Sequence, residues 1–436
     1  MEYRESFDID KREIRRKRRQ RNQALSYLIL FLVIVAAAVG VVLGVRQYTE
    51  RKEKSGEQAG HDKLEQILQS EEPIVMETSS EVIPEPTPEE RLDEIVEAAI
   101  EGMSLEDKVA GLFIVTPEAI TGVATAVRAG DGTREALSKY AVGGIVYFSK
   151  NIQSEDQLKT MISNTRSFSR YPLFICVDEE GGSVSRIAGS GLASKVDSAK
   201  KIGQTGDSNN AYVAGSTIGT YLADLGFDLN FAPVADIANV DNSVMESRSY
   251  GLDAASVAAF VTSMMLGLEE QDVTSCLKHF PGIGSTAQDT HDGIAVSNRS
   301  EEEFWANEFA VFQTGIDAGA NMIMVGHMAA PSLVGDNTPS SMSSIIITDI
   351  LRKELGFEGV VISDAMNMSA ISAYYESDQA AITALKAGCD MILMPDDFAQ
   401  AYNGVLQAVK EGVISEERVN DALRRIYRIK FADKVE

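Results

Sequence analysis

Residues 173–182 have the sequence LFICVDEEGG, in which five apolar residues run directly into three carboxylates and two glycines. A continuous apolar run without polar alternation is typical of a strand buried on both faces of a parallel sheet. The polar residues that follow belong at the carboxyl end of that strand, the edge at which α/β folds carry their functional groups. The stretch therefore predicts a buried strand that leads into a functional site.

Seven further runs have the same character, and amphipathic segments lie between or after them. The eight expected strands are residues 111–115, 144–148, 173–177, 229–233, 274–279, 322–326, 359–363 and 391–394. The clearest helical segments are 208–225, 301–318, 344–355 and 415–429. This alternation favours an α/β fold of the (β/α)₈ TIM type. An open doubly wound sheet is the alternative, but no GxGxxG follows the first strand and no GxxxxGK[ST] occurs, so a nucleotide-binding version is not indicated.

Composition divides the 436-residue chain into four expected parts. Residues 1–23 form a basic tail, 24–45 an almost wholly apolar segment, 46–90 an acidic linker and 91–436 the barrel domain. The apolar segment has 22 residues, which suits the roughly 30 Å hydrocarbon core of a bilayer. We expect one transmembrane helix, an uncleaved signal anchor, ahead of the barrel. A buried core helix or a cleaved signal peptide are the competing interpretations.

The distribution of charge sets the expected location. Nine Lys and Arg residues against five Asp and Glu residues lie within positions 1–21, before the apolar segment. The positive-inside rule then predicts a single-pass protein of the cell membrane with a cytoplasmic tail and an extracytoplasmic barrel domain. The linker has twelve acidic and four basic residues from Gln47 to Glu90 and includes the segment PEPTP, so we expect a disordered tether.

The composition disfavours a nucleic-acid partner and a cysteine-based ligand site. A net charge of -25 repels phosphate backbones, so no nucleic-acid partner is expected, although a basic run such as 11–19 can also be a nuclear signal or a nucleic-acid arm. The cysteines, Cys176, Cys276 and Cys389, lie in or beside apolar runs without short ligand spacing. Buried core residues explain them best.

Polar residues gather just beyond the expected strand ends. They are Asp178, Asp236, Arg248, Lys278, His279, His327, Asp364, Asp396 and Asp397. His291 lies in the glycine-punctuated segment 282–293, a loop able to cover a ligand and suited to a proton donor. There is no HxH or HExxH, so no metal site is expected.

Several segments carry a resemblance to a known family. They are DEEGGSVSR (178–186), LGFDLNFAPVADI (225–237), RSYG (248–251), KHFPGIG (278–284), DTH (289–291) and LRKELGFEGVVISDAM (351–366). In this order they resemble glycoside hydrolase family 3, and within it the single-domain β-N-acetylhexosaminidase branch. The resemblance begins near Met103 and extends to the end of the chain.

The resemblance implies a role for each site residue. Asp364 is similar to the family's nucleophile, which forms a covalent glycosyl-enzyme. His291 is similar to the histidine that this branch uses as acid and base, and Asp289 would orient its ring. Substrate-binding positions are matched by Asp178, Arg248, Lys278 and His279, and Lys278 and Arg248 are further expected to keep Asp364 ionised if they lie near it. Only about 40 residues follow the last strand, so the proton donor must come from the barrel.

Three departures from the family pattern put substrate contacts in doubt. Ile283 stands where the branch usually has a second histidine, Ser183 replaces an arginine, and Ala365 follows the expected nucleophile. The resemblance nevertheless implies a retaining hydrolase that releases terminal β-linked N-acetylglucosamine from carbohydrate, in a bacterium from cell-wall fragments, without a cofactor. A β-glucosidase, a glycoside phosphorylase or a non-catalytic cell-wall-binding barrel are the alternatives.

Overall fold

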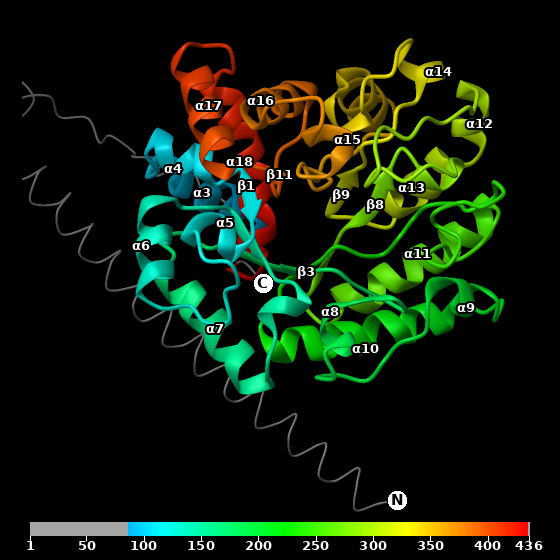
Figure 1. Ribbon diagram of the computed structural model, residues 1–436, viewed down its shortest axis with the longest axis horizontal. Coiled ribbons are helices and arrows are strands. Elements are labelled where there is room, and N and C mark those ends of the chain that lie inside the picture. The colour runs from blue at the N-terminus through cyan, green and yellow to red at the C-terminus, as the bar shows by residue number, and fades with distance from the viewer. Residues whose placement is uncertain (1–85, 435–436) are drawn as a thin grey trace, which may run out of the picture. The chain divides into compact units, whose positions relative to one another are not determined.

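Parallel strands form a ring in the computed structural model, which describes residues 86–434 (Figure 1). The strands are β1 (Phe113–Val115), β2 (Gly144–Val146), β3 (Phe174–Val177), β6 (Leu229–Asn230), β7 (Thr274–Ser275), β8 (Leu277–Phe280), β9 (Met322–Val325), β10 (Val360–Ser363) and β11 (Ile392–Leu393). All of their apolar side chains are buried, as continuous apolar runs require. The eight runs identified in the sequence each contain one of these strands, and 274–279 contains β7 and most of β8.

Two ladders make up the ring. One has the order β11-β1-β2-β3-β6-β7 and the other the order β10-β9-β8, with every neighbouring pair parallel. Cys276 separates β7 from β8, so these two strands occupy one position in the ring. Single bridges between Val234 and Lys278 and between Ile362 and Met391 join the two ladders. The result is a TIM-like barrel rather than an open sheet.

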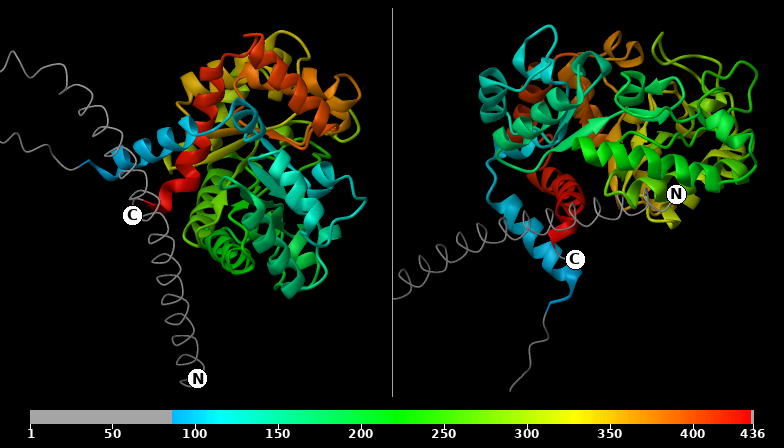
Figure 2. Two further views of the ribbon diagram at one scale, coloured as in Figure 1. Left: turned by 90° about the vertical axis from the view of Figure 1, so that its left-hand side faces the viewer. Right: turned by 90° about the horizontal axis from the view of Figure 1, so that it is seen from below.

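Helices follow the strands and cover the outside of the ring (Figures 1 and 2). They are α3 (Pro88–Glu101), α4 (Leu105–Ala110), α5 (Pro117–Thr121), α6 (Asp131–Lys139), α7 (Glu155–Phe168), α8 (Arg186–Gly189), α9 (Ala199–Gly203), α10 (Asn209–Leu225), α11 (Ala254–Glu269), α12 (Glu301–Ala306), α13 (Glu308–Asp317), α14 (Pro331–Val334), η4 (Ile345–Glu354), α15 (Ser369–Ser372), α16 (Ser377–Ala387), α17 (Phe398–Lys410) and α18 (Glu416–Phe431). The expected helix 301–318 is split at Asn307, and η4 is a π-helix.

Two short antiparallel strands, β4 (Glu179–Gly181) and β5 (Val184–Ser185), extend the chain after β3. Gly181 and Gly182 have φ angles of 92° and 61° within this hairpin, a conformation that glycine adopts without steric cost. The hairpin fixes Glu179 and Glu180, both of which are buried. The sequence DEEGG thus places two carboxylates at the carboxyl end of the ring.

The fold class expected from the sequence is wrong in placing a transmembrane helix and a disordered tether before the barrel. Within residues 86–434 no helix combines the length and apolarity that a bilayer span requires. The expected tail, the span at 24–45 and most of the tether lie outside the described residues. The end of the expected tether is helical, because α3 begins at Pro88. The fold class that the structure supports is a TIM-like α/β barrel.

The start of α3 shows why acidic composition misled the prediction there. Thr87 and Glu90 form a capping box, which satisfies backbone N–H groups at the helix start. Arg428 of α18 forms ion pairs with Glu89 and Asp93. The two helices lie side by side (Figure 2). A cationic partner distant in sequence therefore stabilises a segment that looks too acidic to fold alone.

Candidate active site

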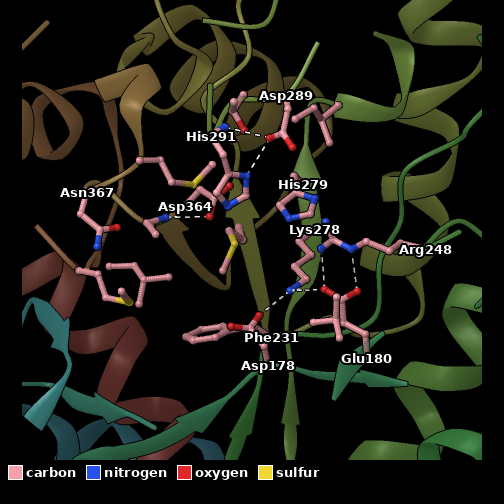
Figure 3. Close-up of a pocket in the computed structure, with 18 of the residues that line it drawn as sticks. Asp178, Glu180, Phe231, Arg248, Lys278, His279, Asp289, His291, Asp364 and Asn367 are labelled. Carbon is pink, nitrogen blue, oxygen red and sulfur yellow. Dashed lines mark hydrogen bonds and ion pairs between the residues drawn. The ribbon is translucent and has the colours of Figure 1, made fainter. Parts of the chain in front are cut away.

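A cavity of about 470 Å³ opens at the carboxyl ends of the strands (Figure 3). Its volume lies in the range of small-molecule binding sites. All seven site residues predicted from the sequence line it: Asp178, Arg248, Lys278, His279, Asp289, His291 and Asp364. They come from five different strand ends or loops, so the barrel brings together groups that are up to 186 positions apart in the chain.

Lys278 is the centre of a charged cluster on one wall. Its Nζ lies 2.7 Å from Oδ1 of Asp178 and 2.7 Å from Oε1 of Glu180. Arg248 binds the same Glu180 through two nitrogens, with Nε 2.9 Å from Oε2 and Nη2 2.6 Å from Oε1. Such two-point contacts are among the strongest hydrogen bonds in proteins. The cluster is rigid and presents both donors and acceptors to the cavity.

The cluster keeps Glu180 and Lys278 ionised although both are buried. Burial alone would raise the pKa of Glu180, but the charges of Lys278 and Arg248 outweigh it and hold that pKa well below its usual range. Burial would lower the pKa of Lys278, but Asp178 and Glu180 raise it overall. An ionised Glu180 cannot donate a proton at neutral pH, which disfavours it as a general acid.

Asp364 follows β10 on the opposite wall (Figure 3). Its Oδ1 accepts a hydrogen bond of 2.7 Å from the N–H of Ala365. Burial would raise the pKa of Asp364, but His279, His327 and this hydrogen bond lower it, and Lys278 adds a smaller effect. The carboxylate is therefore ionised and available as a nucleophile.

The predicted support of Asp364 by Lys278 and Arg248 needs a correction. Lys278 does lower the pKa of Asp364, although the effects of the two histidines are larger. The guanidinium of Arg248 is instead turned toward Glu180 (Figure 3). Its position in the sequence could not show which of several carboxylates it would meet.

His279 and His327 have different surroundings near Asp364. Nδ1 of His279 lies 2.8 Å from Oδ2 of the fully buried Asp236, which fixes the ring at the cavity wall. His327 is fully buried, with Nδ1 2.7 Å from Oγ of Ser341 and Nε2 3.0 Å from the carbonyl oxygen of Ala365. Burial lowers the pKa of His327. Both of its ring nitrogens are engaged, so His327 is a poor candidate for proton transfer to a ligand.

His291 and Asp289 form a pair at the mouth of the cavity (Figure 3). Nδ1 of His291 lies 2.8 Å from Oδ1 of Asp289, and the backbone N–H of His291 donates to the same oxygen at 2.9 Å. Burial would raise the pKa of Asp289, but these two hydrogen bonds lower it overall. The ring is held through Nδ1 and its side chain is 70% exposed, so Nε2 is left for a ligand.

Sequence reasoning undervalued two cavity residues. Glu180 received no role of its own from the sequence, yet it joins Lys278 to Arg248. Arg186 lines the cavity, and its Nε is buried without a hydrogen-bond partner. Both lie in DEEGGSVSR, the segment that carries the family resemblance, so the signal was present. Glu179, its neighbour, accepts hydrogen bonds from the backbone of Ile187 and Ala188 and does not line the cavity.

The described residues contain no set of side chains suited to bind a metal ion. Among residues 86–434, no group of three or more His, Cys, Asp and Glu side chains is arranged to hold a metal ion. The three cysteines are buried and unpaired, and burial raises the pKa of each thiol. What the cavity offers chemically is one ionised carboxylate, one exposed imidazole and a charged hydrogen-bonding wall.

Comparison with known sequences identifies a family and two relatives of this chain. Residues 104–429 match the family model described as the glycosyl hydrolase family 3 N-terminal domain. A beta-hexosaminidase A of Pseudoalteromonas piscicida is 32% identical over 328 residues, which are 68% of this chain and 54% of that protein. A beta-N-acetylglucosaminidase/beta-glucosidase of Cellulomonas fimi is 31% identical over 300 residues, 66% of this chain and 52% of that protein. The chain thus spans about half the length of these two relatives.

A solved structure agrees with the sequence comparison. The chain is similar to a glycoside hydrolase family 3 beta-N-acetylglucosaminidase from Paenibacillus sp. str. FPU-7, with a TM-score of 0.72 and 33% identity. The match covers 77% of this chain and 63% of that one. The family match over residues 104–429 includes every residue that lines the cavity.

Proposed function

The chain belongs to glycosyl hydrolase family 3, as its motifs predicted, and on this premise we propose that it is a retaining glycosidase that releases terminal β-linked N-acetylglucosamine. The names of its relatives support the choice of sugar, since each includes a hexosaminidase or N-acetylglucosaminidase activity. The observation that carries the proposal is the shared cavity of Asp364 and His291 (Figure 3).

Asp364 is the proposed nucleophile. Its carboxylate attacks the anomeric carbon, and the bond between that carbon and the leaving oxygen breaks as a glycosyl ester forms. The negative charge also stabilises the positive charge that develops on the sugar ring. The lowered pKa of Asp364 supports this role, because only the ionised form can attack.

His291 is the proposed acid and base. In the first step the imidazolium gives its proton to the leaving oxygen, and in the second the neutral ring takes a proton from the water that attacks the glycosyl ester. The ester then opens, and Asp364 is restored as carboxylate. Asp289 holds Nδ1 and stabilises the positive ring, so Nε2 faces the reacting bond.

The wall made by Asp178, Glu180, Arg248 and Lys278 is the proposed binding surface for sugar hydroxyls. Ionised donors and acceptors at fixed positions suit a polyhydroxylated ring, because each hydroxyl can both donate and accept. His279 would add a ring nitrogen to this surface. Ile283, Val244 and Met245 give the cavity an apolar side, which suits the methyl group of an N-acetyl substituent.

The test is hydrolysis by the full chain of two chromogenic substrates that differ only at C2, the β-N-acetylglucosaminide and the β-glucoside. We expect the N-acetylglucosaminide to give the higher kcat/KM. Higher kcat/KM for the glucoside would make the protein a β-glucosidase. Acceleration by inorganic phosphate with release of a sugar phosphate would make it a phosphorylase, and binding of glycan without turnover would make it a binding module.

The natural setting stays a prediction from the sequence. The alternation of apolar runs and amphipathic segments predicts the barrel domain over residues 91–436, and the excess of basic residues within positions 1–21 predicts an extracytoplasmic location. If the source is a bacterium, cell-wall fragments are the substrate that this location predicts. Fractionation of cells with an antibody to the barrel would show whether the chain is exported.

A further inference from the structure

Residues 282–299, here called the acid/base loop, leave the barrel after β8 and return to it before α12. The loop carries both Asp289 and His291. It has two legs, 282–285 and 297–299, and Oγ of Ser285 lies 2.9 Å from Oγ of Ser297 across its neck. The position of the proposed acid therefore depends on how these legs are held.

One buried carboxylate touches both legs. Glu308, the first residue of α13, is fully buried, and its Oε1 lies 2.8 Å from Nε of Arg299 at the end of the loop. Its Cγ lies so close to Gly282, at the start of the loop, that an added Cβ there would be 2.3 Å away. Glu308 is thus in contact with the first leg and paired with the second.

The helix that carries Glu308 is itself fixed to the barrel. Phe309, the next residue of α13, stacks on Phe280 of β8 with ring centroids 5.4 Å apart. Phe312 meets the same Phe280 edge to face at 5.0 Å. The carboxylate therefore stands on a rigid support, directly behind the strand that supplies Lys278 and His279.

The pair is a poor source of stability. Neither oxygen of Glu308 accepts a hydrogen bond from the residues the structure describes, and Nε of Arg299 donates none. Burial raises the pKa of Glu308 to about 7 even though Arg299 opposes the shift. Nη2 of Arg299 donates a hydrogen bond to Oδ1 of Asn239, but the carboxylate of Glu308 has no such support, and a buried ion pair with an unsatisfied carboxylate contributes little net stability. Arg299 and Gly282, the two loop residues that Glu308 meets, belong to the loop that carries the proposed acid.

An open hollow lies beside the loop. The hollow has a volume of about 610 Å³. It is lined by Ser285, Thr286, Ala287, Gln288, Val296, Asn298 and Arg299 of the loop and by Val240, Asp241 and Glu303 outside it. The loop has space to move away from the cavity on this side. The contacts of its two legs therefore decide where it lies. Gly284 is hydrogen-bonded to Ser243 and Asp236, and Ser297 to Ala329. Arg299 is held by Asn239 and Glu308.

We propose that Glu308 and Arg299 are positioning residues, which clamp both legs of the acid/base loop so that His291 reaches the leaving oxygen. The proposal rests on the proposed function of His291. It concerns where the acid is held and not the chemistry that the acid performs.

The experiment compares two N-acetylglucosaminides, one with the acidic dinitrophenol leaving group and one with an alkyl leaving group. Departure of dinitrophenolate needs little protonation, whereas departure of an alkoxide depends on the acid. Displacement of the proton donor should therefore slow the cleavage of mainly the alkyl substrate. In Glu308→Gln of the full chain we expect kcat on the alkyl substrate to fall by roughly tenfold or more, because small misplacements of a catalytic group are costly. On the dinitrophenyl substrate the first step should change less than threefold.

Two further variants separate positioning from general damage. Glu269→Gln removes another carboxylate whose pKa is raised by burial, in α11 and away from the loop, and should change both substrates equally. Arg299→Gln removes the other half of the pair. Like Glu308→Gln, it should lose more activity on the alkyl substrate than on the dinitrophenyl substrate, a difference here called the split. The double variant should lose no more than the worse single variant, because the two residues act as one unit.

Equal losses on both substrates in a folded Glu308→Gln, or no loss on either, would overturn the proposal. If Glu308→Gln does not fold, the result for Arg299→Gln decides in the same way. Failure of the proposed function is distinguishable, because His291→Ala would then show no split between the two substrates. The clamp is supported only when His291→Ala and the Glu308 or Arg299 variant all lose more activity on the alkyl substrate than on the dinitrophenyl substrate.

Discussion

Nδ1 of His291 lies 2.8 Å from Oδ1 of Asp289, two residues earlier in the same loop. The contact is local in sequence, but it becomes useful only because the loop extends over a cavity whose wall carries Asp364, 73 positions later (Figure 3). An imidazole held at one nitrogen and exposed at the other can give and take a proton. The predictions below test the groups that surround this arrangement.

Removal of the imidazole tests the proton donor. His291→Ala should lose far more activity on alkyl or sugar leaving groups than on dinitrophenolate, because only the former need an acid. The second step still needs a base, so glycosyl-enzyme should accumulate with the good leaving group, and azide should release it as a β-glycosyl azide. Asp289→Asn should show a weaker form of this pattern. Equal losses, without an azide product, would move the role away from His291.

The charged wall should make the fold sensitive to acid. The pKa of Glu180 is lowered in the folded chain, so its ionised form stabilises the fold above the ordinary value of 4.5, and this stability is lost as the pH falls below it. Glu180→Gln should therefore have a flatter decline of unfolding free energy below pH 4.5 than the unmodified chain. It should also raise KM, since Lys278 and Arg248 lose their common partner. Parallel urea titrations at several pH values would show an unchanged decline if the pairing is wrong.

Glu308 should have the opposite effect of pH. Its pKa is raised from 4.5 to about 7, so the folded chain keeps a proton that the unfolded chain releases. Stability from this group is fully present below pH 4.5 and is lost as the pH rises to about 7, by roughly 3 kcal/mol at most. Glu308→Gln should remove this loss. Identical slopes for both chains between pH 5 and 7 would contradict the buried position of Glu308.

Gly282 should tolerate no side chain. Its φ is 126°, and a Cβ would lie 2.3 Å from Cγ of Glu308, so Gly282→Ala adds a clash to backbone strain. We expect a lower melting temperature and a lower kcat. Gly335→Ala is the matched control, because Gly335 also has a positive φ, 90°, but nothing lies within 4 Å of its added Cβ. A Gly282→Ala chain no less stable than that control would show that Glu308 leaves room for a side chain at position 282.

The strands were predictable because their side chains are buried on both faces, and such residues form continuous apolar runs whatever the loops between them do. The register of the strands and the pairing of charged side chains at the strand ends were not predictable. The sequence placed Lys278, Arg248 and Asp364 at one edge, but the pairing of Arg248 with Glu180 rather than with Asp364 depends on how the hairpin after β3 folds. The clamp by Glu308 escaped notice because an isolated glutamate in an amphipathic segment looks like a surface residue.

The most direct test of the central claim is the site of covalent labelling by a 2-fluoro glycosyl inhibitor, which forms a glycosyl-enzyme that hydrolyses slowly. The full chain should be inactivated with time, and mass spectrometry of its peptides should place one sugar on Asp364. Asp364→Asn should keep the fold, lose turnover and take up no label, since an amide of similar volume cannot attack the anomeric carbon. A label on any other residue, or inactivation of Asp364→Asn, would contradict the account.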